Sequence, residues 1–482
     1  MIFDDFLAKI EQNVALKPTK EQSLCMECFS EFVRSRQQNA LFLLTGYAGT
    51  GKTTLVAAIV RTLVEWKQRV VLLAPTGRAA KVFSQHAGMP AFTIHRRIYR
   101  EQSEERFSLR PAELNRDTLF VVDEASMIAN EGLSGNLFGT GCLLDDLLQF
   151  VYGGQNCRLM LVGDSAQLPP VGETISPALS CEALEARGFF VAHCELTEVV
   201  RQLSDSGILW NATMLRNTLS LQLFHAFPQL CVKPFADICV VPGAELIESL
   251  EQSFYRSGAD ETIVVTRSNR RAVAFNNGIR ARILGMEDEL TSGDRIIVAK
   301  NNYFWMQHEP TPQVPQSSRG ALASCDFIAN GDMAVVRRFR NERELYGFRF
   351  ADVVLEFPDY DCREVECTVL LDTLQAEAPS LAQEQQQQLF DAVWADYPDI
   401  TVKRDRMKRL REDAYYNALQ IKYAYAVTCH KAQGGQWEHV YIDQGYITEE
   451  MLTPAYFRWP YTALTRATQQ VFLVNWPENC LC

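Results

Sequence analysis

The residues with the clearest chemistry in this 482-residue chain form a glycine-rich loop at residues 46–54, which reads G-Y-A-G-T-G-K-T-T. An apolar run precedes the loop, and a helix-like stretch follows it. Backbone amides of such a loop turn inward around phosphates, a lysine adds positive charge, and the next hydroxyl can join a magnesium shell. This context predicts a nucleotide phosphate cradle rather than an ordinary glycine turn. Its expected residues are Gly46, Gly49, Thr50, Gly51, Lys52, Thr53 and Thr54.

An acidic pair follows a second apolar run, residues 119–122. Asp123 is placed to hold magnesium through water, together with Thr53, and Glu124 to polarise the attacking water. The cradle alone does not say what the nucleotide is spent on, because kinases, GTPases, transporters and motors share it. The acidic pair strengthens the prediction of a hydrolytic site.

Two more apolar runs, residues 70–74 and 159–162, end in the polar loops 75–80 and 163–170. Open parallel sheets bind ligands at the carboxyl ends of their strands. We therefore expect the four loops to converge on one crevice. Four unrelated surface loops are the alternative.

A similar pattern occurs in the C-terminal part, where runs at 262–266 and 424–427 lead into polar loops. A last pair of runs, 440–442 and 471–474, flanks residues 461–467. Two α/β halves with one cradle suggest that ATP lies between them and that an arginine reaches the γ-phosphate. Arg201 and Arg466 are the candidates for this role, with an ordinary surface role as the alternative for each.

The ordered set of motifs resembles the superfamily 1B helicases, specifically their RecD-like and Dda-like branch, from about residue 15 to residue 474. The resemblance implies an α/β fold with two RecA-like P-loop motor domains, an inserted SH3-like β-barrel and a helical tower or hook segment. The implied ranges are 1–195 for the first motor domain, with a small pin-like insertion at about 97–117, and 196–290 plus 421–482 for the second. The barrel is expected at 291–375 and the tower at 376–420.

The resemblance also implies roles for individual residues. Gln22 is expected to read adenine, Gln167 to sense the γ-phosphate, and Gly434 to belong to the nucleotide site. The implied catalytic set is Lys52, Asp123, Glu124, Gln167, Arg201 and Arg466. The implied DNA-binding set is Pro75, Thr76, Arg78, Thr93, His95, Asn269, Tyr303, Thr428, His430 and Lys431. Phe107 is a candidate strand-separating wedge, with plain packing as the alternative.

Residues 293–295, 301–303 and 330–332 resemble the barrel of this branch, although Ala334 stands where the family usually has glycine. DNA clamping is the expected role of the barrel, and lipid or peptide binding is the alternative. The tower segment contains the basic run 403–411, which either touches phosphates or forms a solvated helix face.

The predicted function is an ATP- and magnesium-dependent DNA helicase that moves 5′ to 3′ on single-stranded DNA and unwinds duplexes with a 5′ tail. Alternatives are an RNA-directed motor of the same superfamily, a translocase that needs a partner to unwind, and a passive single-strand binder with a decayed ATPase. Single-strand-binding, repair, recombination or replication proteins are expected partners. Since the chain begins about twenty residues before Gln22, we expect a free-standing and monomeric motor.

The composition agrees with a soluble cytoplasmic enzyme. No apolar stretch reaches the ~18 residues that span a bilayer, and the N-terminus lacks the basic start of a signal peptide. The fourteen cysteines fit reduced thiols, and Cys25 and Cys28 lack the second pair that a zinc site needs. The net charge of −12 predicts a locally basic DNA groove with acidic outer faces, because salt screens each patch beyond ~8 Å.

Overall fold

The computed structural model describes residues 2–14, 17–103, 106–130, 139–199, 205–306 and 327–482. The chain divides into two compact units, one comprising Met1–Val240 with Ala432–Cys482 and the other Val241–Lys431. Within the described residues, no helix is long and apolar enough to cross a membrane. The cysteines in those ranges are free thiols.

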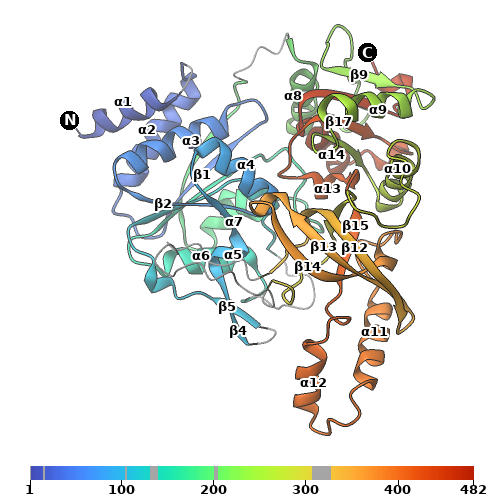
Figure 1. Cartoon of the computed structure of the whole chain (residues 1–482). Helices are drawn as coiled ribbons and strands as arrows, with labels where there is room; N and C mark the ends of the chain where they lie inside the picture. Colours follow the sequence, from blue (N-terminus) through green and yellow to red (C-terminus); the bar gives the residue numbers. More distant parts are fainter. Residues whose placement is uncertain (1, 15–16, 104–105, 131–138, 200–204, 307–326) are drawn as a thin grey trace. The chain divides into compact units, whose positions relative to one another are not determined.

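The first unit is built on a six-stranded parallel sheet in the order β3-β2-β6-β7-β1-β8 (Figure 1). β1, β2, β6 and β7 are the four strands that the sequence predicts, and β3 and β8 are additional. The strands are β1 Ala40–Gly46, β2 Arg69–Ala74, β3 Ala91–Thr93, β6 Thr118–Val122, β7 Arg158–Gly163 and β8 Phe190–Leu196. β1 lies between β7 and β8, so the phosphate loop leaves an inner strand of the sheet.

Helices cover this sheet. Its strands are almost wholly apolar, as expected for a parallel sheet that is buried on both faces. Phe29 of α2 packs edge-on against Phe42 of β1, with ring centroids 5.3 Å apart. The helices are α1 Ile2–Asn13, α2 Lys20–Arg34, α3 Lys52–Glu65, α4 Gly77–Ala87, α5 Ile94–Ile98, α6 Leu143–Tyr152 and α7 Cys181–Glu185. A further helix, α8 Gly207–Ser220, packs instead against α14 Pro454–Leu464. This core fixes the edge of the sheet from which the polar loops emerge.

A two-stranded antiparallel hairpin, β4 Tyr99–Ser103 and β5 Arg106–Leu109, occupies the predicted pin-like insertion. The side chain of Phe107 lies outside the described part of the structure. The C-terminal segment of the first unit adds β17 Trp437–Asp443, α14 Pro454–Leu464 and β18 Ala467–Val474, and β17 runs parallel to β18.

The second unit contains a closed barrel of five strands in the order β11-β12-β13-β14-β15, which confirms the predicted inserted barrel. The strands are β11 Arg295–Val298, β12 Met333–Leu345, β13 Phe348–Phe357, β14 Arg363–Leu370 and β15 Leu419–Tyr423. Ala334 lies inside β12 opposite Ile296, and the preceding turn is made by Gly331 at φ +94°. The alanine is therefore accommodated, because its position needs no left-handed backbone.

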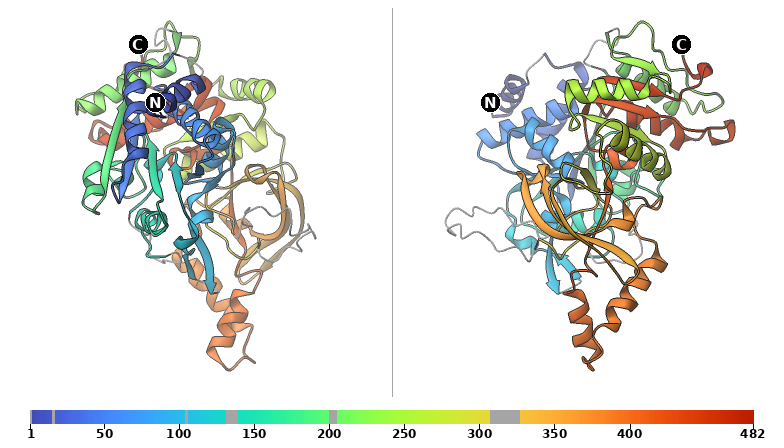
Figure 2. Two further views of the ribbon diagram at one scale, coloured as in Figure 1. Left: turned by 90° about the vertical axis from the view of Figure 1, so that its left-hand side faces the viewer. Right: turned by 45° about the vertical axis from the view of Figure 1, so that its right-hand side comes forward.

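Two helices, α11 Gln383–Ala395 and α12 Lys403–Arg411, are inserted between β14 and β15 and lie side by side beyond the barrel (Figures 1 and 2). They share a small apolar cluster that includes Leu389, Val393 and Leu410. The Arg406 guanidinium also lies 4.5 Å from the Trp394 ring centroid. The same unit holds α9 Leu246–Ser257, α10 Asn269–Arg282, and the parallel pair of β10 Thr262–Thr266 and β16 Ala426–Thr428.

A buried ion pair ties α10 to the start of the barrel. The Asp294 carboxylate accepts hydrogen bonds from Nε and Nη2 of Arg280, each at 2.8 Å, and from the Thr291 amide at 2.9 Å. Asp294 is fully buried and Arg280 is 5% exposed. Both charges are therefore compensated inside the protein.

Replacing Asp294 with alanine leaves this guanidinium buried without its carboxylate, so we expect a loss of about 3–5 kcal/mol in the stability of the second unit. Urea-dependent hydrogen exchange of the β11 and β15 amides measures this loss. Glu366→Gln, which removes an exposed partner 3.0 Å from Arg340, is the control and should change little. Equal effects of the two variants would contradict the assignment.

Candidate functional site

The phosphate cradle joins β1 to α3, as the sequence predicts. Gly49 and Gly51 adopt left-handed backbone angles of +79° and +80°. A Cβ on Gly46 would lie 2.9 Å from the Leu196 carbonyl oxygen, and one on Gly49 would lie 2.8 Å from the Leu209 side chain. These positions therefore require glycine. Gly51 caps the N-terminus of α3, where backbone amides and the helix dipole favour an anion.

Lys52 is held inside the cradle. Its ammonium donates to the Tyr47 carbonyl at 2.9 Å and lies 4.0 Å from the Asp164 carboxylate. A bound phosphate would compete with both partners for this charge.

Three carboxylates follow the neighbouring strands β6 and β7. Burial, and then the charge of Glu124, raises the pKa of Asp123 to about 7. Burial also raises the pKa of Asp164, which is 1% exposed. Glu124 has a left-handed backbone with φ +51°, so the chain turns away from the direction of β6 at this residue. The predicted convergence of the loops on one edge of the sheet is thus observed for Lys52, Asp123 and Asp164.

Helix α14 contributes a tyrosine to this cluster. The Tyr461 hydroxyl donates to the Asp164 carboxylate at 2.6 Å and accepts from the Ala48 amide at 2.9 Å. It therefore joins the phosphate loop to the loop after β7. Burial raises the pKa of Tyr461 far above its usual value, which keeps the hydroxyl protonated as a donor.

Arg466 lies just beyond α14. Its Nη1 is 3.5 Å from a carboxylate oxygen of Glu124 and 3.3 Å from the Gly435 carbonyl. Its Nε donates to the Thr462 carbonyl at 3.2 Å. The side chain is 3% exposed, so the surface alternative does not hold for this arginine. The structure brings Arg466 to Glu124, whereas Arg201 lies outside the described residues.

The loop after β7 is also fixed by hydrogen bonds to the C-terminal segment. The Leu168 amide donates to the Thr462 hydroxyl at 2.9 Å, and the Leu168 carbonyl accepts from Gln433 at 2.7 Å. Arg458 donates to the carbonyls of Ser165 and Gln167. The Gln167 side chain is 6% exposed, and its buried side-chain amide oxygen, Oε1, has no hydrogen-bond partner within the described structure.

Gln22 lies beside the cradle at the start of α2. Its Nε2 donates to the Thr50 carbonyl at 2.9 Å, and its Oε1 accepts from the Thr19 amide at 3.1 Å. Thr19 in turn caps the helix through its hydroxyl, which accepts from the Gln22 amide. The capping box therefore fixes this glutamine against the phosphate loop.

The predicted DNA-binding residues of the first unit gather at the amino end of α4. The Thr76 hydroxyl caps this helix, and the Arg78 guanidinium donates to the Gln436 carbonyl at 3.1 Å and lies 5.4 Å from the Trp437 ring centroid. Gly434, at φ +74°, packs so closely that a Cβ would come within 2.8 Å of Ala79. Gly434 therefore lies against the α4 motif rather than among the residues of the phosphate loop.

Thr93 caps the short helix α5, on which His95 lies. Burial lowers the pKa of His95 to about 4, so this imidazole is neutral near pH 7. Pro75 ends the β2 strand run and precedes Thr76. These residues follow β2 and β3 at the same edge of the sheet as the cradle.

In the second unit, Asn269, Thr428 and Lys431 line one small pocket. Burial, and then the charge of Lys422, lowers the pKa of Lys431 to about 8, and its ammonium makes no hydrogen bond within the described structure. Burial also lowers the pKa of His430. The ring of Tyr303 packs 5.3 Å from that of Phe327.

The main residues that sequence reasoning missed are Asp164, Tyr461 and Arg458. Asp164 follows β7 in the way that Asp123 follows β6, and this repeat was the available signal. Tyr461 opens a polar segment between two apolar runs. Arg458 lies within an apolar helix, and no spacing marked it.

Comparison with known proteins adds independent findings. A family model described as an AAA domain matches residues 27–218, and one described as a UvrD-like helicase C-terminal domain matches residues 423–474. The chain is 28% identical over 301 residues to the ATP-dependent RecD2 DNA helicase of Deinococcus radiodurans, covering 60% of this chain and 38% of the relative. It is 31% identical over 180 residues to the ATP-dependent DNA helicase dda of Enterobacteria phage T4, covering 36% and 37%.

The chain thus spans less than two fifths of the length of these curated relatives. Among solved structures, a Pif1 helicase from Bacteroides in complex with ADP-AlF3 and ssDNA is 15% identical, with 97% of this chain and 95% of that chain covered and a TM-score of 0.45. That score is too low to establish the fold by itself. The two family models match the segments that carry the cradle, the acidic pair, Tyr461 and Arg466, and the chain is therefore similar to ATP-dependent DNA helicases of the RecD2 and Dda type over these segments.

Proposed function

We propose that the protein is an ATP-driven DNA helicase that moves 5′ to 3′ along a single strand. The observation that carries the proposal is the position of Arg466, which reaches Glu124 beside a phosphate cradle. An arginine at a hydrolytic carboxylate supplies positive charge to the γ-phosphate in the transition state. DNA as substrate is supported by the RecD2 and Dda relatives, and the polarity by the resemblance to superfamily 1B helicases.

The residues present fit ATP with magnesium. Thr53 and Asp123 offer the hard oxygen donors that this ion prefers, and burial, then the charge of Glu124, raises the pKa of Asp123, so a cation at this carboxylate would stabilise its charged form. When bound, magnesium neutralises charge on the β- and γ-phosphates. Lys52 then exchanges its Tyr47 carbonyl for phosphate oxygens, and Glu124 orients the attacking water.

Arg466 has two successive partners in this proposal. Without nucleotide it neutralises Glu124, and with ATP it turns to the γ-phosphate and leaves Glu124 to act on water. The buried side-chain oxygen of Gln167 has no partner within the described structure. Gln167 responds to the exchange of partners at Arg466 and transmits it through Leu168 to α14. The hydrogen bonds of Tyr461 to Ala48 and Asp164 keep the two loops in register while this exchange occurs.

ATP must provide direction, because strand capture alone is nearly balanced. Opening one base-pair step costs ~1.4 kcal/mol, while stacking a freed base on an aromatic ring returns ~1–3 kcal/mol. Passive capture therefore melts a fork without choosing a direction. An RNA-directed motor is the second candidate, since 2′-hydroxyl recognition is not visible in these motifs.

Strand displacement tests the function directly. The protein is incubated with ATP and magnesium on duplexes that carry a 5′ or a 3′ single-stranded DNA tail, with matched RNA-tailed duplexes as a further arm. We expect unwinding from the 5′ DNA tail alone. Unwinding from the 3′ tail would refute the polarity, and unwinding of RNA alone would replace DNA as the substrate.

Lys52→Ala removes the ammonium of the cradle and should abolish ATP hydrolysis while single-stranded DNA binding stays within about twofold. Steady-state ATPase and fluorescence anisotropy measure the two properties. Lys17→Ala, at an exposed position before α2, is the control and should leave both unchanged. Retained turnover in the Lys52 variant would overturn the assignment of the cradle.

Arg466→Ala should lower kcat by about 10³-fold or more while nucleotide affinity changes little, because a finger arginine acts mainly in the transition state. Since Arg466 also bonds to the carbonyls of Thr462 and Gly435, Arg466→Lys is measured beside it. A lysine restores the positive charge but not the planar guanidinium group. We therefore expect partial recovery of kcat at an unchanged melting temperature. A fall in melting temperature with unaltered kcat would assign the arginine a purely structural role.

A further inference from the structure

A hollow of about 1120 Å³ lies at the edge of the six-stranded sheet opposite the phosphate cradle. Its lining includes the first residues of four parallel strands, Ala40 of β1, Arg69 of β2, Thr118 of β6 and Arg158 of β7. The carboxyl ends of these parallel strands lie at the phosphate cradle, and their amino ends lie at the hollow. The hollow is therefore separate from the nucleotide site already described.

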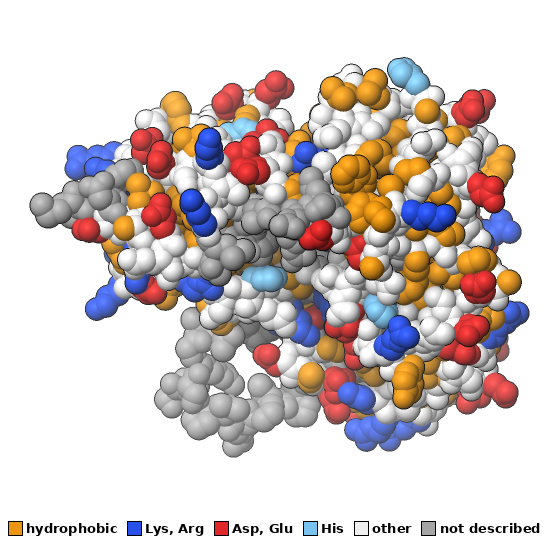
Figure 3. Space-filling model, turned by 90° about the horizontal axis from the view of Figure 1, so that it is seen from above, with side chains coloured by type: hydrophobic (Ala, Val, Ile, Leu, Met, Phe, Trp, Pro, Cys, Tyr) orange, Lys and Arg blue, Asp and Glu red, His pale blue; other side chains and the backbone are white. Residues whose placement is uncertain are grey.

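The lining is strongly basic in a chain that is acidic overall. Asp117 is the one carboxylate in the lining, and it accepts a hydrogen bond from Asn156 at 2.7 Å. Six basic residues accompany it: Arg34, Arg36, Lys67, Arg69, Arg116 and Arg158. The whole chain has 47 basic and 59 acidic residues, so this ratio is the reverse of the average. On the face seen in Figure 3, by contrast, basic and acidic side chains are interspersed.

Internal contacts account for two of these charges, because Arg34 and Arg158 both have partners. Arg158 donates to the carbonyls of Phe32 and Ser35, and its guanidinium lies 5.3 Å from the Phe32 ring centroid. The side chains of four others, Arg36, Lys67, Arg69 and Arg116, are exposed, and none makes a hydrogen bond or ion pair within the described structure. Four uncompensated cations thus surround one concave surface.

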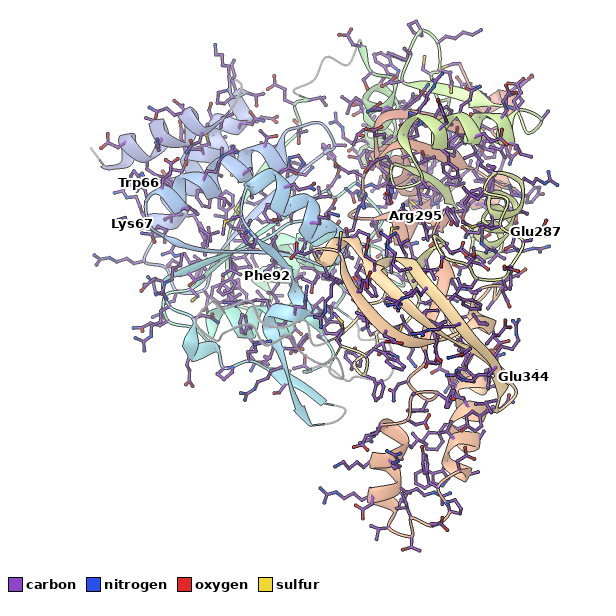
Figure 4. All side chains as sticks on the ribbon, viewed as in Figure 1. Trp66, Lys67, Phe92, Glu287, Arg295 and Glu344 are labelled. Atoms are coloured by element: carbon purple, nitrogen blue, oxygen red, sulfur yellow. The ribbon has the colours of Figure 1, made fainter. Side chains whose placement is uncertain are left out.

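Helix ends explain only part of this charge. Basic residues at a helix C-terminus stabilise the helix, but the effect fades beyond the last turn. The interaction with a helix C-terminus accounts for Arg34, in the last turn of α2. It also accounts for Lys67, which lies just past the end of α3 and is labelled in Figure 4. Arg69 is the first residue of β2 and Arg116 lies two residues before β6, so neither is compensated by a helix C-terminus.

Backbone conformation also marks this rim. Asn39, Lys67, Asp117 and Asn156 all have left-handed backbones, with φ between 48° and 59°. Asparagine and aspartate tolerate this region through local hydrogen bonds, whereas lysine gains no such compensation. Lys67 is therefore a cation at a turn position where glycine or asparagine would cost less.

We propose that this hollow is a second nucleic-acid site, in which Arg36, Lys67, Arg69 and Arg116 bind the sugar-phosphate backbone of DNA without reading its sequence. Lysine and arginine gain affinity from phosphates by releasing condensed counterions. Several separate loops supply the cations, which suits a polyanion better than a single phosphate. The proposal rests on the proposed function only in the choice of DNA as the polyanion.

The salt dependence of DNA binding tests the site. Each lost phosphate contact lowers the slope of log K against log salt by about 0.7 for a single strand and about 0.9 for a duplex. Arg36→Gln with Arg116→Gln should therefore reduce the slope by about 1.4 or about 1.8, and the two DNA forms reveal which one occupies the hollow. ATPase without DNA should stay unchanged. The matched control is Arg256→Gln with Arg282→Gln, which removes the same charge from exposed positions on α9 and α10.

A photocrosslink locates the contact independently of unwinding. p-Benzoylphenylalanine in place of the exposed Gln37, which lines the hollow, should crosslink to DNA, whereas the same group in place of the exposed Tyr255 should not. Absence of the Gln37 crosslink together with equal slopes in both double variants would overturn the proposal. Because both readouts measure binding, failed strand displacement would refute the helicase proposal and leave this one standing.

Discussion

The site depends on one hydrogen-bonded bridge, in which the Tyr461 hydroxyl links the Ala48 amide to the buried Asp164 carboxylate. An uncompensated carboxylate in this position would be costly, because burial strongly disfavours its charge. Tyr461, the Ala166 amide and Lys52 together stabilise that charge. Since the three groups come from α14, the loop after β7 and the cradle, the nucleotide site forms only when all three elements are in place.

The charged groups of the site pair with other groups of the protein. Lys52 pairs with a carbonyl and Asp164, and Arg466 pairs with Glu124, so the charges that act on ATP already have protein partners. ATP must replace these contacts by better ones, and the residues released are those that do the chemistry. A site of this kind avoids leaving catalytic charges unpaired between turnovers, at some cost in nucleotide affinity.

Local patterns predicted the parts of the site that lie next to one another in sequence. The cradle, Asp123, Glu124 and the four strands before the polar loops were all visible as apolar runs with polar ends. β8 was missed because its burial alternates irregularly, and β15 because a strand that closes the barrel follows two helices. The contacts of Tyr461 and Arg458 cross almost 300 positions, and no period in the sequence encodes such a pairing.

The bond between Ala48 and Tyr461 spans 413 positions of the chain. During synthesis the phosphate loop therefore emerges long before the tyrosine and the arginine that complete its surroundings. A nascent chain in which only the six-stranded sheet has been synthesised contains the cradle but lacks Arg466. We expect such a chain to hydrolyse little ATP. On the proposed function, hydrolysis needs Arg466 and therefore follows the synthesis of the barrel and its helical insertion, so the order of translation delays the activity until the intervening segments exist.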